Sequence, residues 1–163
     1  MNNEEKKKLV LFDIDYTLFN TGTFIKSNLS EYELYQEIIE VLEKVGKIAE
    51  LGILSEGKND FQREKLIRTG ILEHFTKEKI HIVENKEDFI NNIIKTYKDF
   101  KIFLVDDKIN ILIQAKKFDP SVYAIWVKRG PFAENAELNN FHPDCILEEL
   151  ADLENVIKSY GRS

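Results

Sequence analysis

The chain has 163 residues, of which 43% are hydrophobic, and this suits one domain over residues 1–163 with a substantial core. Its formal net charge of −6 provides no global basic field, so nucleic acid is not an expected partner. No apolar run is long enough to span a bilayer, and the start MNNEEKKK has no apolar signal segment, so we expect a cytoplasmic protein without a membrane partner.

The first predicted element is a strand over residues 8–12, whose apolar run KLVLF lacks the alternation of a half-exposed strand. Asp13 and Asp15 follow it. Because residues i and i+2 of an extended segment face the same way, both carboxylates converge beyond the strand's carboxyl end, where open α/β sheets bind ligands. Two close anions favour a cation between them, and their oxygens suit Mg²⁺. An acidic strand-to-turn exit is the alternative interpretation.

The segment after this acidic loop predicts a helix, because apolar residues recur at helical spacing from Leu34 to Val45. Ser30 and Glu33 have the spacing of a capping box, and Gly46 is expected to end the helix.

Strands and helices alternate through the rest of the chain. A strand through IAELGILS delivers Ser55 to its end, and Asn59 is expected to cap a helix that stops at Gly70. The later predicted elements are a strand KIHIV, a helix over 87–97, a strand KIFLV, a helix over 109–117, a strand VYAIWV, and a short strand or turn leading into a closing helix within 145–160. This alternation predicts a parallel sheet with right-handed crossovers.

Four polar clusters stand just past four predicted strands: Asp13 with Asp15 and Thr17, Ser55, Lys86, and Asp106 with Asp107 and, one turn later, Asn110. If the first and fourth strands are neighbours at the switch point of a doubly wound sheet, all four clusters face one crevice. Carboxylates, a hydroxyl and a lysine around a cation would bind a phosphoryl group on Mg²⁺.

At these residues the sequence resembles the phosphatase branch of the haloacid dehalogenase superfamily. FDIDYT, LGILSEGKNDFQREKLIRTGILEHF with its usual downstream Gln and Lys-Leu, ENKED, and FLVDDKIN resemble the four motifs in order. VYAIWVKRG and HPDCILEELADL resemble later segments, so the likeness covers nearly the whole chain. It implies a Rossmann-like α/β/α three-layer fold. The short connections between motifs resemble the capless kind, without a sizeable cap domain.

The resemblance also implies roles for the acidic residues. Asp13 would be the nucleophile that forms an aspartyl-phosphate, and Asp15 would act as general acid and then general base. The Asp13 and Asp106 carboxylates and the Asp15 backbone carbonyl would hold Mg²⁺. Asp107 and Asn110 would orient Lys86 or metal-bound water.

Thr17, Ser55 and Lys86 would bind the substrate, the last two at its phosphoryl oxygens. Lys58 is a rival to Lys86, since both follow a strand end by three residues. Glu56 stands where its charge would disfavour a phosphate, so we expect it to point away from the site.

The implied activity is Mg²⁺-dependent hydrolysis of a phosphomonoester, carried by a small molecule or exposed on a macromolecule. A catalytically silent module that binds a phosphorylated ligand or a protein is the competing hypothesis, because fold does not imply function. Retention of Asp13, Asp15, Ser55 and Asp106 argues for catalysis. The substrate and the oligomeric state stay open.

Overall fold

β1 (Lys7–Phe12) lies near the middle of a six-stranded parallel sheet in the computed structural model, which describes residues 4–160. The strand order is β3-β2-β1-β4-β5-β6, so β1 and β4 are neighbours, as predicted. The other strands are β2 (Glu50–Glu56), β3 (Ile80–Val83), β4 (Phe100–Asp106), β5 (Tyr123–Val127) and β6 (Cys145–Leu147). The carboxyl ends of β1, β2 and β4 therefore meet at one edge, where ligands bind in such sheets.

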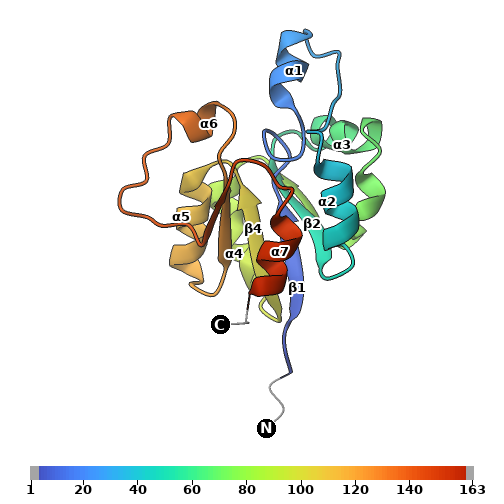
Figure 1. Ribbon diagram of the computed structural model, residues 1–163. Coiled ribbons are helices and arrows are strands. Elements are labelled where there is room, and N and C mark those ends of the chain that lie inside the picture. The colour runs from blue at the N-terminus through green and yellow to red at the C-terminus, as the bar shows by residue number, and fades with distance from the viewer. Residues whose placement is uncertain (1–3, 161–163) are drawn as a thin grey trace.

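Helices cover both faces of this sheet (Figure 1). The helices are α1 (Thr21–Lys26), α2 (Ile38–Val45), α3 (Asn59–Arg68), α4 (Lys86–Thr96), α5 (Ile109–Phe118), α6 (Pro131–Glu134) and α7 (Leu153–Ser159), with short 3₁₀ turns at Leu72–His74 and Lys77–Lys79. Side chains of α2, α3 and α7 share one hydrophobic core, and those of α4 and α5 share the other. The predicted doubly wound, three-layer α/β/α fold is confirmed.

The apolar run of β1 divides between the two cores. Val10 and Phe12 pack into the core under α2 and α7, while Leu9 and Leu11 pack into the core under α4 and α5, and all four are fully buried. Successive side chains of a strand point to opposite faces, so a strand covered on both faces needs apolar residues at every position. This explains why β1 shows no polar alternation.

The predicted helix before β2 is shorter than expected. α2 begins only at Ile38, and the proposed Ser30–Glu33 capping box does not form. Instead, Leu34 forms an antiparallel bridge with Phe19, and the Glu33 carbonyl accepts a hydrogen bond from the Asn20 backbone N–H at 2.8 Å. Pairing with the loop after β1 thus replaces the first helical turns in this segment.

One short helix was not predicted, and one further local prediction needs correction. The stretch from Phe19 to Asn28, to which the sequence analysis assigned no element, contains α1, which Asn20 caps by accepting a hydrogen bond from the Thr23 backbone N–H. Asn59 is the first residue of α3 and not its cap, and its side chain accepts a hydrogen bond from Arg63 Nε at 3.0 Å. The predicted stop at Gly70 holds, because this glycine follows α3 with a positive φ of 75°.

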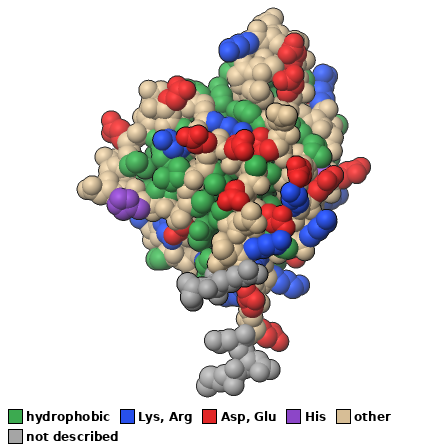
Figure 2. Space-filling model, in the orientation of Figure 1, with side chains coloured by type: hydrophobic (Ala, Val, Ile, Leu, Met, Phe, Trp, Pro, Cys, Tyr) green, Lys and Arg blue, Asp and Glu red, His purple; other side chains and the backbone are tan. Residues whose placement is uncertain are grey.

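α1 projects above the sheet edge as a small knob, and α6 stands on the other side of that edge (Figures 1 and 2). These short segments, and no sizeable cap domain, lie over the strand ends among the described residues. Within residues 4–160, no helix has the length and apolar character needed to cross a membrane.

Candidate active site

The chain turns sharply where it leaves β1. The Ile14 carbonyl accepts backbone hydrogen bonds from Thr17, Leu18 and Phe19, and Tyr16, directly after Asp15, adopts a left-handed φ of 58°. Tyr16 N–H is satisfied by Thr21 Oγ1 at 3.0 Å. This turn ends the strand and holds Asp13 and Asp15 at the sheet edge.

The Tyr16 ring requires a glycine on the segment after β5. A Cβ atom on Gly130 would lie 2.5 Å from Cδ1 of Tyr16, and Gly130 itself has a positive φ of 82°. Only glycine combines that conformation with so close an approach. The start of α6 is therefore fixed against the loop that carries the two aspartates.

A buried group of four charged side chains lies at the ends of β1 and β4. Lys86, the first residue of α4, places its Nζ 3.0 Å from Asp13 Oδ1 and 2.7 Å from Asp106 Oδ2. Oxygens of Asp13, Asp106 and Asp107 lie within 4.8 Å of one another. The structure thus brings together Lys86 and three of the predicted acidic residues, whereas Lys58 is exposed at the start of α3.

The two adjacent aspartates after β4 have different surroundings. Asp106 is fully engaged: Oδ2 accepts a hydrogen bond from Lys86, and Oδ1 accepts one from the Lys108 backbone N–H at 2.9 Å. Both carboxylate oxygens of Asp107 are buried and, among the described residues, have no hydrogen-bond partner. The cluster has three carboxylates and one ammonium, so its net charge is −2 when all four groups are ionised.

The pKa values of this cluster reflect its burial. Burial raises the pKa of Asp13 to about 6, although Lys86 acts in the opposite direction. Burial, followed by the charges of Asp13 and Asp106, raises the pKa of Asp107 to about 10. Burial alone would lower the pKa of Lys86, but Asp106 and Asp13 raise it above its usual value. Because the pKa values of Asp13 and Asp107 are both raised, an additional positive charge is needed to hold these two carboxyls in their ionised forms.

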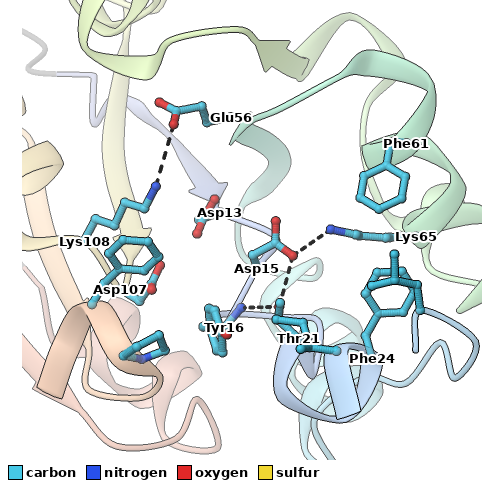
Figure 3. A pocket seen from close by; sticks show the side chains of 14 residues that line it. Asp13, Asp15, Tyr16, Thr21, Phe24, Glu56, Phe61, Lys65, Asp107 and Lys108 are labelled. Carbon is cyan, nitrogen blue, oxygen red and sulfur yellow. Dashed lines mark hydrogen bonds and ion pairs between the residues drawn. The ribbon is translucent and has the colours of Figure 1, made fainter. Parts of the chain in front are cut away.

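Asp15 points away from that cluster and is held by three donors. Its oxygens accept hydrogen bonds from Thr21 Oγ1 at 3.0 Å, Gln62 Nε2 at 2.9 Å and Lys65 Nζ at 2.7 Å. Helices α1 and α3 supply these donors, so the two helices fix the orientation of Asp15 from one side (Figure 3).

Lys65 is a site residue to which the sequence analysis gave no role. It is buried, it also donates to Gln62 Oε1 at 2.7 Å, and its ammonium lies 4.7 to 5.6 Å from the ring centroids of Phe19, Phe24 and Phe61. Such a cation is stabilised by both its carboxylate and the ring faces. The Gln and Lys-Leu of the second motif were the available sequence signal, because they mark Gln62 and Lys65.

A cavity of about 440 Å³ opens above the aspartates. Asp13, Asp15 and Asp107 line it, together with Glu56 and Lys108 (Figure 3). Lys86 and Ser55 lie behind this surface and do not line it. The Ser55 hydroxyl accepts a hydrogen bond from Gln62 Nε2 at 2.8 Å, so its contact with a phosphoryl oxygen stays a prediction.

Three predicted positions differ from the structure. Glu56 lines the cavity and does not point away, because the Lys86 backbone N–H binds its carboxylate at 2.9 Å and Lys108 Nζ lies 3.8 Å from it. Thr17 is fully buried off the cavity wall, with its hydroxyl unpartnered among the described residues. Asn110 is exposed and donates to Glu87 Oε1 at 2.8 Å, so it orients neither Lys86 nor the acidic cluster.

Comparison with solved structures identifies this architecture. A haloacid dehalogenase-like protein from Burkholderia xenovorans superposes with a TM-score of 0.80 at 18% identity, over 94% of this chain and 98% of that one. The L-2-haloacid dehalogenase of Xanthobacter autotrophicus gives 0.70 at 13% identity, over 95% and 100%. YfnB from Bacillus subtilis, a protein of the same fold bound to magnesium, gives 0.72 at 10% identity, over 94% and 100%.

The chain therefore has the haloacid dehalogenase-like fold, which the four sequence motifs indicated. No protein-family model and no curated protein matches it in sequence. Identities this low establish the shared fold, and the chemistry must be argued from the site.

Proposed function

We propose that this protein is a Mg²⁺-dependent phosphatase that hydrolyses phosphomonoesters through an aspartyl-phosphate on Asp13. The observation that carries the proposal is the buried cluster below the cavity, where Asp107 has two unpartnered carboxylate oxygens and the ionised group has a net charge of −2. A buried anion without a partner is costly unless a cation binds it.

The donor set fits a hard divalent cation. Asp13 and Asp107 both line the cavity and offer carboxylate oxygens that lie within 4.8 Å of each other, and the backbone carbonyl of Asp15 would complete the protein's contribution. Asp106 was the carboxylate predicted from the sequence, but its contacts with Lys86 and the Lys108 N–H favour Asp107 for this role. When bound, Mg²⁺ would offset the negative charge of the phosphoryl group and of its nucleophile. The magnesium in YfnB is consistent with this choice.

In the first step, an Asp13 oxygen attacks phosphorus, and the bond to the ester oxygen breaks as that oxygen takes a proton from Asp15. In the second step, Asp15 removes a proton from water, which attacks the same phosphorus. Inorganic phosphate leaves and the Asp13 carboxylate is restored. Lys86 holds Asp13 in place throughout, since it bridges this residue to Asp106.

The position of Asp15 suits proton transfer to the ester oxygen. It lines the cavity, its side chain keeps 31% exposure, and Thr21, Gln62 and Lys65 leave it little freedom to rotate. A fixed acid loses less entropy in the transition state than a mobile one.

Halide displacement is the other chemistry found among the neighbours of this fold. A halide leaves carbon as an anion and needs no proton, so neither a proton donor at Asp15 nor an unpartnered Asp107 would have a task in that displacement step. Both residues have one in phosphoryl transfer, which supports the phosphatase proposal.

The test is phosphate release with and without Mg²⁺ from a panel of sugar phosphates, nucleotides, phosphoamino acids and aryl phosphates. We expect release that requires Mg²⁺ and that Asp13→Asn abolishes. Mg²⁺-dependent binding of these esters without any turnover would instead indicate a catalytically silent phospho-ligand module.

A further inference from the structure

The walls of the cavity differ in chemistry from its floor. The floor carries the carboxylates of Asp13, Asp15 and Asp107, whereas apolar side chains rise on two sides. Phe24 and Phe61 stand on the side of Lys65, as Figure 3 shows, and Ile25 and Leu29 extend this wall from α1 and the turn after it. Pro131 and Phe132 of α6 form the other apolar wall.

These walls contain unusually exposed large apolar residues. Relative exposure is 57% for Ile25, 53% for Leu29, 44% for Phe61 and 51% for Phe132. Four such side chains around one concave site form an apolar surface that a ligand can cover. The 440 Å³ volume is the size of a small-molecule site.

The lysine ammonium groups and the Thr21 hydroxyl around the cavity already have partners within the protein. Lys65 is bound by Asp15 and Gln62, and Lys108 lies near Glu56 and 4.5 Å from the centroid of the Phe132 ring. The Thr21 hydroxyl donates to Asp15 and accepts from Tyr16 N–H. The walls therefore offer little to a second phosphate or to a ring of sugar hydroxyls, and Glu56 would repel further negative charge.

The aromatic part of the wall is held in place before any ligand binds. The ring centroids of Phe24 and Phe61 lie 6.0 Å apart, and both rings face the ammonium of Lys65, which Asp15 anchors. Phe24 is only 2% exposed and supports Phe61, whose exposed ring is the preformed aromatic surface on this side. Such a surface favours a flat partner, because binding then costs little side-chain ordering.

We propose that this cavity binds the leaving group of a small phosphomonoester whose alcohol is uncharged and aromatic. This inference rests on the proposed phosphatase function for the orientation of the ester, with its phosphoryl group on the aspartate floor and its ring between α1 and α6.

The experiment compares 2-phenylethyl phosphate with ethyl phosphate at saturating Mg²⁺. Both esters release a primary alkanol, so they differ mainly in the ring. We expect kcat/KM to be higher for the phenylethyl ester by on the order of 10-fold or more, the scale for filling an apolar pocket. Ile25→Ser and Phe132→Ser, on opposite walls, should each reduce this preference several-fold.

The matched control is Phe89→Ser. Phe89 is 47% exposed on α4 and does not line the cavity, so its substitution should leave the preference unchanged. Equal kcat/KM values for the two esters in the wild-type protein, or equal effects of the control and wall variants, would overturn the inference while leaving the phosphatase function intact.

A binding measurement separates failure of the function from failure of the inference. Calorimetric titration would use the two corresponding phosphonates, in which a methylene replaces the ester oxygen and prevents hydrolysis. If no ester is turned over but the phenyl-bearing phosphonate binds at least 10-fold more tightly, the phosphatase proposal fails and the cavity assignment stands. If the two phosphonates bind equally, or neither binds, the cavity assignment fails.

Discussion

Lys86 Nζ lies 3.0 Å from Asp13 Oδ1, although the two residues are 73 positions apart in the chain. The start of α4 fixes the lysine backbone, and the side chain reaches the end of β1, where it also contacts Asp106. Lys86 is buried and forms an ion pair with Asp13, the proposed nucleophile.

Lys86→Ala should lower kcat/KM on the order of 10²-fold or more, the scale for losing one preorganised electrostatic contact. It should also lower the free energy of unfolding by about 3–5 kcal/mol, because buried carboxylates lose their partner. Lys58→Ala, at the exposed start of α3, is the control and should change neither quantity appreciably. Steady-state kinetics and urea denaturation would measure both; a crippled Lys58 variant would contradict the assignment.

Asp13→Asn should abolish turnover with the fold intact, because an amide cannot attack phosphorus and is a poorer ligand for a cation. Phosphate release and thermal unfolding would be followed together. Acid quenching during turnover should trap a phosphorylated wild-type protein and no phosphorylated variant. Appreciable activity in a stable Asp13→Asn protein would exclude the aspartyl-phosphate mechanism.

Asp15→Ala should slow hydrolysis of 2-phenylethyl phosphate far more than that of phenyl phosphate. The phenolate leaves without help, whereas the alkoxide needs a proton, so the difference should fall within the roughly 10²- to 10⁴-fold of general acid catalysis. Both esters carry a ring, so contacts with the cavity walls vary little between them. Equal losses on the two substrates would remove Asp15 from the acid role.

Asp107→Asn should separate metal binding from folding. Mg²⁺ should raise the Tm of the wild-type protein, since a ligand that binds only the folded state adds about 2.7 kcal/mol at 100 times its Kd. The variant should lose most of this shift. Without metal, its stability should equal or exceed that of the wild type, because an unpartnered buried carboxylate has been removed.

Asp99→Asn, on an exposed carboxylate away from the cavity, serves as the control for this substitution and should respond to Mg²⁺ as the wild type does. An unchanged Mg²⁺ shift in Asp107→Asn would show that the cation binds elsewhere.

The free energy of unfolding of the metal-free protein should receive a contribution from Asp13 and Asp107 that decreases as the pH rises. The folded-state pKa of Asp13 is about 6 and that of Asp107 about 10, both above the usual 3.8, so the folded state binds more protons than the unfolded state. The stabilising contribution of each carboxyl to the free energy of unfolding is therefore fully present below about pH 4 and declines as the pH rises. For Asp13 this decline is complete once the pH has passed about 6, and for Asp107 it continues toward about pH 10.

Urea titrations in EDTA between pH 4 and 9 would measure this decline. Asp107→Asn should show a shallower slope, and saturating Mg²⁺ should flatten the wild-type profile, because the cation favours the ionised carboxylates. A metal-free wild type that gains stability over the same range relative to Asp107→Asn would contradict the raised pKa values.

The sheet was predictable from the sequence because its strands carry strong local signals. β1 and β4 are short apolar runs that end in aspartates, and their places beside each other follow from the rules of doubly wound sheets. The segment before α2 was not predictable in the same way. Its helical spacing is real, but hydrogen bonds and a bridge to the loop after β1 decide its conformation, and these depend on tertiary contacts.

The candidate site shows the same division. Asp13, Asp15 and Lys86 follow from strand ends and motif order, but neighbouring residues such as Asp106 and Asp107 present the same local pattern. Only packing decides which of them meets Lys86 and which faces the cavity. Lys65 likewise lies mid-helix, where no strand end signals its approach to Asp15.

The floor and the walls of the cavity come from different parts of the architecture. The aspartates stand at the ends of central strands with two-sided cores, whereas Ile25 and Phe132 belong to α1 and α6, short elements at the periphery. Substitutions at the exposed positions of α1 and α6 would therefore leave the packing of the central strands unchanged. New substrate preferences could be selected, in nature or by directed evolution, by diversifying exposed positions such as Ile25 and Phe132 while the reaction centre is inherited unchanged.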